Sequence, residues 1–372
     1  MLRFVALLLL AAPAVAQTDP RVRATLGGTL QLDSRLFPEG PAGDTPGFLV
    51  RRARAEVTAE IAGRLRAVGE VDVGEGVVEL TDGYLDADLG RGLRVRAGRF
   101  KTPFGAESLR SSSDLRFAER AFPTALSPRR DVGAMLSGTW ERFGVQAGVF
   151  NGVPDGASRQ TASDAHLDAA ARVVAQPLPA VGLGVAASAG TERGAPGRSE
   201  LADYDSPGDR VLFDYADGTV ADGRRVRLGP HATLDAGPLH VLGEWTWAQH
   251  RLATPAGRSD VTHQAWQVAA SVVLAGEPRG PRRPAPRQDV TAGGIGAIEV
   301  SARVHGLRID PDAPAAPGAA QRATALGVAA QWSPVSEVRL GVTAERTVAR
   351  PFAGGAGLQP ETVVIVRVAL AL

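Results

Sequence analysis

Residues 52–61 read RARAEVTAEI, and the pattern of this stretch decides the fold. Apolar and polar residues alternate along it, so Ala55 and Val57 fall on one face of an extended chain. Arg54 and Glu56 fall on the other face. A period of two residues is typical of a β-strand whose faces meet different surroundings, whereas a helix would mix the two sets. The stretch therefore predicts a strand with one apolar and one charged face.

The same alternation recurs along the chain and predicts sixteen strands, expected at residues 21–33, 47–61, 64–74, 78–89, 93–101, 131–141, 143–150, 165–176, 181–191, 225–235, 239–251, 263–275, 296–309, 323–333, 337–347 and 361–372. Short turns such as Ala62-Gly63 alternate with longer segments at about 34–46, 102–130, 151–163, 192–224, 252–262, 310–322 and 348–360. Outer-membrane barrels show this alternation of turns and loops. We therefore predict an all-β fold, a transmembrane antiparallel β-barrel of about sixteen strands, a size that leaves an aqueous channel.

The N-terminus predicts export. Residues 1–16 combine Arg3, an apolar run and the small residues Ala14-Val15-Ala16, which is the pattern of a secretory signal peptide. The apolar run is shorter than the ~20 residues that a membrane-spanning helix needs, and no later stretch is long and apolar enough. Only helices and closed barrels satisfy their backbone polar groups in lipid. Residues 17–372 are therefore expected to form a barrel in the outer membrane of a Gram-negative-type bacterium.

Two alternatives remain open at this level. A secreted β-sandwich would bury the apolar stripes against each other and expose the charged faces. In addition, residues 276–295 (GEPRGPRRPAPRQDVTAGGI) are long, basic and rich in proline, although a short turn is expected there. Either the strand count is wrong by one hairpin, or this turn is extended and partly disordered.

The composition argues against several classes of function. The chain has no cysteine, which excludes disulfides and thiol chemistry, and its formal net charge of +1 indicates no nucleic-acid partner. The six histidines are scattered and belong to no hydrolase or metal motif, so we expect no enzyme, no metal and no cofactor. Lys101 is the only lysine, so nearly every basic contact is made by an arginine, which is always charged.

A pore needs a wall of suitable width and charge rather than catalytic residues. The charged faces of three expected strands carry pairs of arginines, which are predicted to line the pore: Arg52, Arg54, Arg64, Arg66, Arg94 and Arg96. Neighbouring strands lie about 4.8 Å apart, so these side chains can form a ladder down one wall. Alternatively, they only pair with the carboxylates between them, such as Glu56 and Glu70, and keep the wall hydrated.

Residues 102–130 are predicted to fold into the barrel and narrow it. Apolar residues such as Leu115, Phe117 and Phe122 recur along this segment, and a loop that met only solvent would not need them. Ser113-Asp114 is a start signal for a short capped helix over the residues that follow. The basic residues expected to set the field of this constriction are Lys101, Arg110, Arg116, Arg120, Arg129 and Arg130.

Several blocks of the sequence resemble the phosphate-selective porin family. They are GRFKTPFGAESLRSSSDLRFAER (98–120), LSPRRDVGAMLSGTW (126–140) and GVQAGVFNG (144–152), of which GRFKTPFG is the most specific part. The resemblance implies a sixteen-stranded, typically trimeric porin whose third loop constricts the pore. In this family inward arginines and a cluster of lysines give selectivity for phosphate, and here Lys101 stands alone.

We therefore expect an outer-membrane porin that allows passive diffusion of small hydrated solutes, either without preference or favouring anions such as phosphate. Its expected partners are outer-membrane lipid, small anionic or neutral solutes, and two further copies of the chain in a homotrimer. The alternative is a non-conducting barrel with a structural or surface-binding role. A lumen filled by residues 102–130 would favour that alternative.

Overall fold

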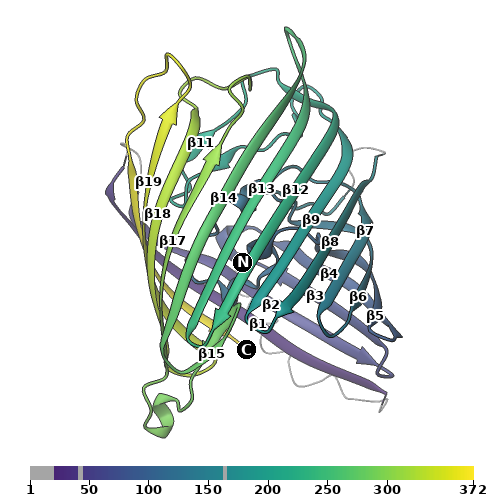
Figure 1. The fold of residues 1–372 in the computed structure, drawn as a ribbon, viewed down its shortest axis with the longest axis vertical. Helices are drawn as coiled ribbons and strands as arrows, with labels where there is room; N and C mark the ends of the chain where they lie inside the picture. Colours follow the sequence, from purple (N-terminus) through teal and green to yellow (C-terminus); the bar gives the residue numbers. More distant parts are fainter. Residues whose placement is uncertain (1–20, 41–44, 162–165) are drawn as a thin grey trace.

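The computed structural model describes residues 21–40, 45–161 and 166–372. The expected signal peptide, residues 1–16, lies outside the described residues. Sixteen strands form one closed antiparallel barrel in which each strand is hydrogen-bonded to its two neighbours. Figure 1 shows the strands as an inclined wall that closes on itself. The fold expected from the alternation is confirmed.

All sixteen expected strands are present. They are β1 (Val22–Glu39), β2 (Gly47–Ile61), β3 (Leu65–Asp72), β4 (Glu79–Gly90), β5 (Leu93–Lys101), β6 (Arg130–Thr139), β7 (Phe143–Phe150), β8 (Asp168–Leu178), β9 (Val181–Arg193), β12 (Val220–Ala236), β13 (Leu239–Thr254), β14 (Gly257–Ala275), β17 (Ala297–Arg308), β18 (Ala320–Ser333), β19 (Val338–Pro351) and β20 (Glu361–Ala371). Outside the barrel, β10 (Tyr204–Asp205) pairs with β11 (Val211–Phe213), and β15 (Glu277–Arg279) pairs with β16 (Arg282–Ala285).

The prediction of a long loop at residues 252–262 is wrong. β13 and β14 continue through most of it and leave a tight turn at residues 255–256. Arg251 lies opposite Asp260, and its guanidinium donates to both carboxylate oxygens at 2.9 and 3.0 Å. The polar residues that suggested a loop are therefore cross-strand partners, which stabilise a strand pair.

The two ends of the barrel sheet meet. Leu30 of β1 lies opposite Leu370 of β20, and Gly28 and Leu372 exchange two backbone hydrogen bonds of 3.3 and 2.9 Å. Closure gives each barrel strand two paired neighbours within the described residues, as lipid requires.

The strand register confirms the two faces. Arg54 lies opposite Asp72 and Ala55 lies opposite Val71, so residues of like character share a face. The apolar stripes lie on the outside of the barrel, where Val57 is 48% exposed and Leu326 is 63% exposed. A sandwich would bury these side chains, so the soluble alternative is wrong.

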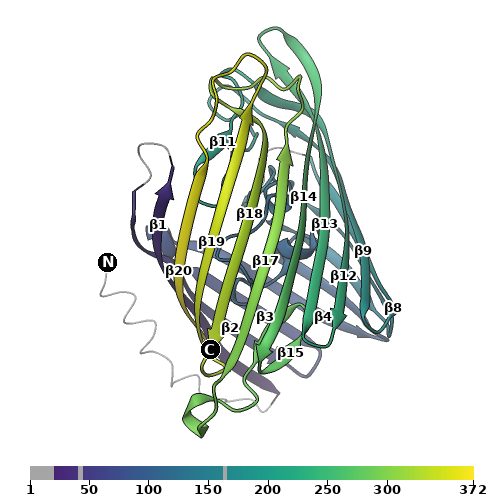
Figure 2. The same cartoon turned by 60° about the vertical axis from the view of Figure 1, so that its left-hand side comes forward.

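Residues 276–295 form an extended turn and add no strand to the barrel, because β14 and β17 on either side of them pair with each other. The turn is folded: it contains the β15–β16 hairpin and the 3-10 helix η3 (Val290–Ala292), whose Ala292 N–H donates to Asp289. Figure 2 shows this turn at the end of the barrel where the short turns lie. The prediction of sixteen strands is therefore confirmed. Of the two alternatives for this segment, the extended turn is present, but it is folded rather than partly disordered.

A hydrophobic core joins the β5–β6 loop and the β9–β12 loop to the barrel wall between β13 and β19. Phe122 and Leu126, between β5 and β6, share it with Tyr204 and Phe213, between β9 and β12. The barrel strands contribute Ala248, Leu252, Val261, Ala265, Leu307, Ala320, Ala323, Ala325 and Ala349. None of the helices in the described part of the chain is long and apolar enough to cross a membrane.

Candidate functional site

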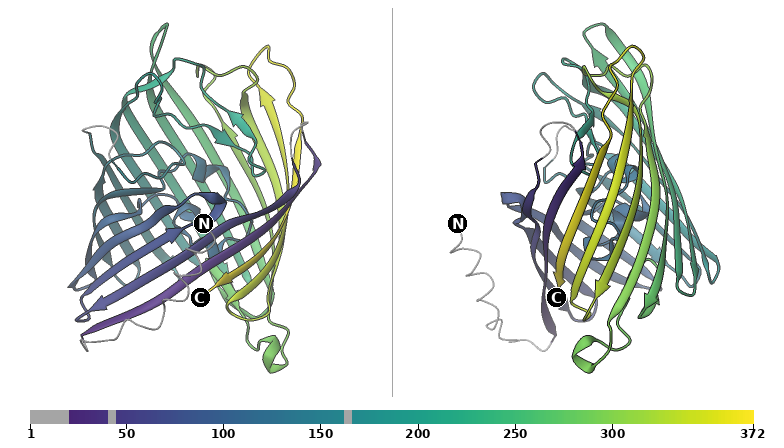
Figure 3. Two further views of the ribbon diagram at one scale, coloured as in Figure 1. Left: turned by 180° about the vertical axis from the view of Figure 1, so that it is seen from behind. Right: turned by 90° about the vertical axis from the view of Figure 1, so that its left-hand side faces the viewer.

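Residues 102–129, called here the connecting segment, join β5 to β6. The segment contains three short helical turns, α2 (Ala106–Leu109), η2 (Ser112–Asp114) and α3 (Phe122–Ala125). Figure 3 shows these turns within the outline of the barrel in two perpendicular views. Hydrogen bonds join the segment to strand side chains on many sides of the barrel: Gln31, Arg51, Glu244, Glu299, His305, Gln331, Arg339, Thr343 and Arg367.

The short helix expected after Ser113-Asp114 is wrong, because residues 115–120 are not helical. Their backbone groups bond to the wall instead. The carbonyl oxygen of Leu115 accepts from Gln331 at 3.0 Å, and the Ala118 N–H donates to Thr343 Oγ1 at 3.1 Å. Backbone polar groups that the strands already satisfy gain nothing from helical hydrogen bonds.

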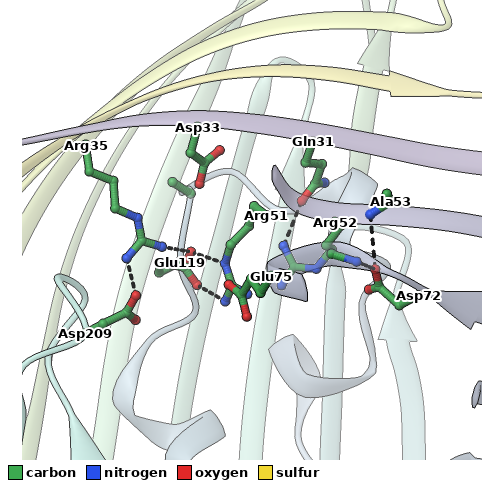
Figure 4. A network of polar contacts seen from close by, with 12 residues as sticks. Gln31, Asp33, Arg35, Arg51, Arg52, Ala53, Asp72, Glu75, Glu119 and Asp209 are labelled. Carbon is green, nitrogen blue, oxygen red and sulfur yellow. Dashed lines mark hydrogen bonds and ion pairs between the residues drawn. The ribbon is translucent and has the colours of Figure 1, made fainter. Parts of the chain in front are cut away.

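Glu119 ties the connecting segment to β1, β2 and β20. Its carboxylate accepts from Arg51 at 2.8 and 2.9 Å, from Arg35 at 3.0 Å and from Arg367 at 3.4 Å. Figure 4 shows Arg35 and Arg51 converging on it. Burial by itself raises the pKa of Glu119, but Arg51 and Arg367 outweigh burial and hold the pKa well below its usual range. The ionised carboxylate is therefore a firm anchor.

One side of the connecting segment is closely packed. Phe122 and Leu126 are 3% and 0% exposed within the hydrophobic core. The Phe122 N–H donates to Nδ1 of His305 at 3.2 Å, and the two rings lie 4.5 Å apart. Because Nδ1 accepts this bond, the proton of the imidazole resides on Nε2, which faces Glu345. Packing and hydrogen bonds together hold this side to β17.

The other side of the segment borders a cavity of about 220 Å³, called here the middle cavity. Strands β2 to β6 form its other wall. Six basic and three acidic side chains line it: Arg52, Arg54, Lys101, Arg120, Arg129, Arg130, Glu56, Glu70 and Asp82. If all are ionised, the basic groups outnumber the carboxylates two to one.

Two of these basic groups have carboxylate partners. Arg54 lies 2.6 Å from Asp72, and Arg130 lies 2.9 Å from Asp82. For the other four, no carboxylate lies within 4.0 Å among the residues that the structure describes: Arg52, Lys101, Arg120 and Arg129. An anion in the cavity would meet cations whose charge is not neutralised at close range.

Neutral groups accept hydrogen bonds from three of the four unpaired cations, Arg52, Lys101 and Arg120. Lys101 Nζ donates to the carbonyl oxygens of Leu109 and Arg110 at 3.3 and 2.5 Å, and Arg52 donates to Gln31 at 2.7 Å. Burial and the neighbouring charge of Arg129 lower the pKa of Arg120 to about 9, so its guanidinium is still protonated at neutral pH. Because Arg120 and Arg129 line the same cavity and repel each other, an anion in that cavity would be attracted by both.

Two further cavities adjoin the middle cavity. A lower cavity of about 770 Å³ towards the short turns includes Arg94, Arg96, Arg110, Arg172 and His231 in its lining. An outer cavity of about 400 Å³ towards the long loops shares Arg52, Arg120 and Arg129 with the middle one. Leu109 lines both the middle and the lower cavities. The three spaces therefore follow one another along the connecting segment.

The outer cavity is more acidic than the middle one. The segment between β9 and β12 contributes Asp203, Asp205 and Asp209, the last of which pairs with Arg35. Burial, together with the negative charges of Asp203 and Asp209, raises the pKa of Asp205 to about 6. In the described residues there is no group of three or more histidine, aspartate and glutamate side chains that could hold a metal ion.

The sequence matches the family model of phosphate-selective porin O and P over residues 25–345. The chain belongs to this family. It is an outer-membrane porin, as the resemblance of residues 98–152 indicated. No curated protein matches the sequence.

Solved porin structures share the fold at low sequence identity. The outer membrane channel DcaP of Acinetobacter baumannii aligns with a TM-score of 0.64 and 10% identity over 95% of this chain and 99% of that chain. The anion-selective porin from Comamonas acidovorans aligns with a TM-score of 0.63 and 13% identity, over 94% of this chain and 100% of that chain. The trimer form of OmpT from Vibrio cholerae gives 0.59 and 11%, over 94% and 99%.

The cavities of the porin contain most of the arginines predicted to line the pore or constrict it. Arg52, Arg54, Arg120, Arg129 and Arg130 meet with Lys101 in the middle cavity, and Arg94, Arg96 and Arg110 meet in the lower one. Lys101 and Arg130 belong to β5 and β6, so they stand at the roots of the connecting segment rather than within it. Arg116 pairs with Glu299. Arg64 and Arg66 line none of the three cavities.

The sequence did not single out Arg51 or Arg172 of the porin. Strict alternation places Arg51 on the outer face, but the β1–β2 register shifts here: Gln31 faces Arg52, and the next residue faces Val50. Arg51 is the extra residue of a β-bulge, which re-aims its side chain towards Glu119. Arg172 lies on the face of β8 that also carries Asp168 and Gln176, and the spacing of these three polar residues would have identified it.

Proposed function

We propose that the connecting segment folds into the lumen of this porin, and that small solutes diffuse past it with a preference for anions. The observation that carries the proposal is the middle cavity, where four of six basic groups have no carboxylate partner within 4.0 Å among the described residues. Its opposite wall is β2 to β6, so the path runs along that side. The segment's hydrogen bonds to many strands and its packing against β13 to β18 support the lumenal position.

In this proposal the cavities act in series. An anion entering from the outer cavity loses part of its hydration to Arg52, Arg120 and Arg129, which line both the outer and the middle cavities. Guanidinium groups donate in a planar fork that suits phosphate and carboxylate oxygens. Glu56, Glu70 and Asp82 keep the site from binding so tightly that the anion cannot leave, which conduction requires.

The proposal includes the route to the membrane and the assembly. Residues 1–16 direct export and are removed, and residues 17–372 insert into outer-membrane lipid. Three copies associate, as in the trimer form of OmpT that shares the fold. The permeating solutes are small anionic and neutral molecules, with phosphate among the anions.

The test is conductance in planar lipid bilayers, with reversal potentials measured in a chloride gradient and again with phosphate. We expect steady conductance and a reversal potential whose sign shows that anions permeate more readily than cations. The double variant Arg120→Gln, Arg129→Gln should lower the ratio of anion to cation permeability several-fold. Arg251→Gln, at an exposed pair with Asp260, is the matched control and should leave the ratio unchanged.

The outcomes separate the candidate functions. Cation preference in the wild-type protein would contradict the anion proposal and leave the barrel intact. No conductance at all would favour a non-conducting structural barrel, which the close packing of Phe122 and Tyr204 in one core supports.

A further inference from the structure

The β15–β16 hairpin touches the connecting segment from the side of the short turns. The Arg283 N–H donates to Oδ1 of Asp114 at 3.1 Å. Arg116 Nη2 donates to the carbonyl oxygen of Gly280 at 2.6 Å, while its Nε donates to Glu299 of β17 at 2.9 Å. Arg116 is buried, so a single guanidinium joins the hairpin, the connecting segment and the barrel wall.

The tip of the hairpin also reaches β12, which only β13 separates from β14, the strand that precedes the hairpin. Gly280 has φ +56°, and a Cβ at this position would lie 3.0 Å from the Asp235 carboxylate. A residue larger than glycine would therefore be strained and would crowd Asp235. The hairpin is thus in contact with β12 at its tip and with β17 and the connecting segment through Arg116.

The hairpin separates two spaces. Pro281 lines the lower cavity, whereas Pro278, Gly280 and Arg282 line a smaller cavity of about 200 Å³. Asp235 lines both. Arg279 also lines the smaller cavity, whereas residues 286–295 of the same turn line neither cavity.

We propose that the β15–β16 hairpin is a second restriction of the pore, at the end of the short turns, and that its arginines add to the anion preference of this exit. The proposal rests on the proposed function, because only a conducting pore can be restricted. Arg279, Arg282 and Arg283 supply three positive charges against Glu277, and none of the three has a carboxylate within 4.0 Å among the described residues. Removal of the hairpin joins the two cavities and widens the exit.

The first experiment shortens the hairpin. Glu277 lies opposite Ala285, so replacing residues 278–284 with Asn-Gly, a preferred two-residue turn, closes the shortened hairpin without moving its ends. We expect the single-channel conductance in bilayers to rise by about half or more, since a narrower exit adds resistance. Arg287→Ala, in the exposed part of the same turn, is the control and should match the wild type. A conductance equal to the wild type in the shortened protein would overturn the restriction.

The second experiment tests the charges while keeping the hairpin. Arg279→Glu with Arg282→Glu should shift the reversal potential in a chloride gradient towards cations. An unchanged reversal potential would overturn the assignment of these arginines to the conducting path. Heat-modifiable electrophoretic mobility verifies that each variant forms a barrel. A wild-type protein that does not conduct would instead contradict the proposed function, so the two failures are distinguishable.

Discussion

The two sides of the connecting segment differ in what they meet. Towards β13 to β18, Phe122 and Leu126 are buried in a hydrophobic core, and His305 accepts the Phe122 N–H. Towards β2 to β6, the segment faces a cavity lined mainly by cations. The packed side uses apolar contacts to fix position, and the open side keeps its charges away from carboxylates. The comparison shows that one segment can be fixed by apolar packing on one side and leave arginines without carboxylate partners on the other.

The strongest way to break this comparison is to place a charge on the packed side. Phe122→Asp should release the segment from the wall, because the loss of a buried phenylalanine costs about 3–5 kcal/mol and an unpaired buried carboxylate adds to it. We expect conductance in bilayers to at least double and thermal unfolding to occur at a lower temperature. Phe122→Leu, which keeps the side chain apolar, should change both far less. Wild-type conductance in the aspartate variant would show that the packing does not hold the segment.

A second prediction concerns the lower cavity on the open side. Arg94 has no carboxylate within 4.0 Å among the described residues, whereas Arg96 pairs with Asp86 at 2.7 Å and lies over the Tyr84 ring at 3.8 Å. Replacing both arginines with glutamate should shift the reversal potential in a chloride gradient towards cations, by about tenfold in permeability ratio. An unchanged potential would place the two side chains outside the conducting path. Arg94→Glu alone should leave the thermal unfolding temperature close to that of the wild type, whereas Arg96→Glu should lower it.

A third prediction separates paired from unpaired cations in the middle cavity. Arg52→Gln and Arg54→Gln each remove one charge, but only the latter removes an ion pair, because Arg54 is the arginine that pairs with Asp72 and also lies 3.4 Å from Glu70. We expect a two- to three-fold fall in the permeability ratio for Arg52→Gln and a larger fall for Arg54→Gln, together with lower thermal stability. Equal effects in both measurements would mean that pairing does not distinguish the two sites.

The smallest expected effect is a pH dependence at the outer cavity. The pKa of Asp205 is raised to about 6, so this carboxyl is mostly ionised at pH 7 and mostly neutral at pH 5. Acidification removes one negative charge near the entrance, so the ratio of anion to cation permeability should rise by less than twofold. Asp205→Asn should raise the ratio of anion to cation permeability already at pH 7, and acidification to pH 5 should then not raise it further. A ratio that falls between pH 7 and pH 5 would contradict the sign.

Period-two alternation was sufficient for the barrel because most strands repeat it. β2 was predicted with its observed ends, and Arg54 opposite Asp72 follows from the alternation in both strands. The same rule fails at Arg51, since a bulge adds one residue that no local pattern marks. It also fails at Leu115 and Ala118, whose partners lie more than two hundred residues later in the chain.

The sequence could predict which residues line the candidate site. It could not predict which of its arginines pair with a carboxylate. The arginines of β2 and β5 were identified from their positions on the charged face. Whether Arg52 or Arg54 has a carboxylate partner depends on the register of β1, β2 and β3, which the sequence does not reveal. The sequence left open whether the arginines form a ladder or only pair with carboxylates. The middle cavity contains both paired arginines, such as Arg54, and unpaired ones, such as Arg52.

Lys101 has a consequence for covalent chemistry. It is the only lysine in the sequence, and its amine stands at the root of the connecting segment, in the lining of the middle cavity. A reagent that acylates amines therefore finds one side-chain target, in the lining of the smallest of the three cavities. Reagents of graded size would turn this single amine into a measure of which molecules reach the middle cavity from each side of the membrane.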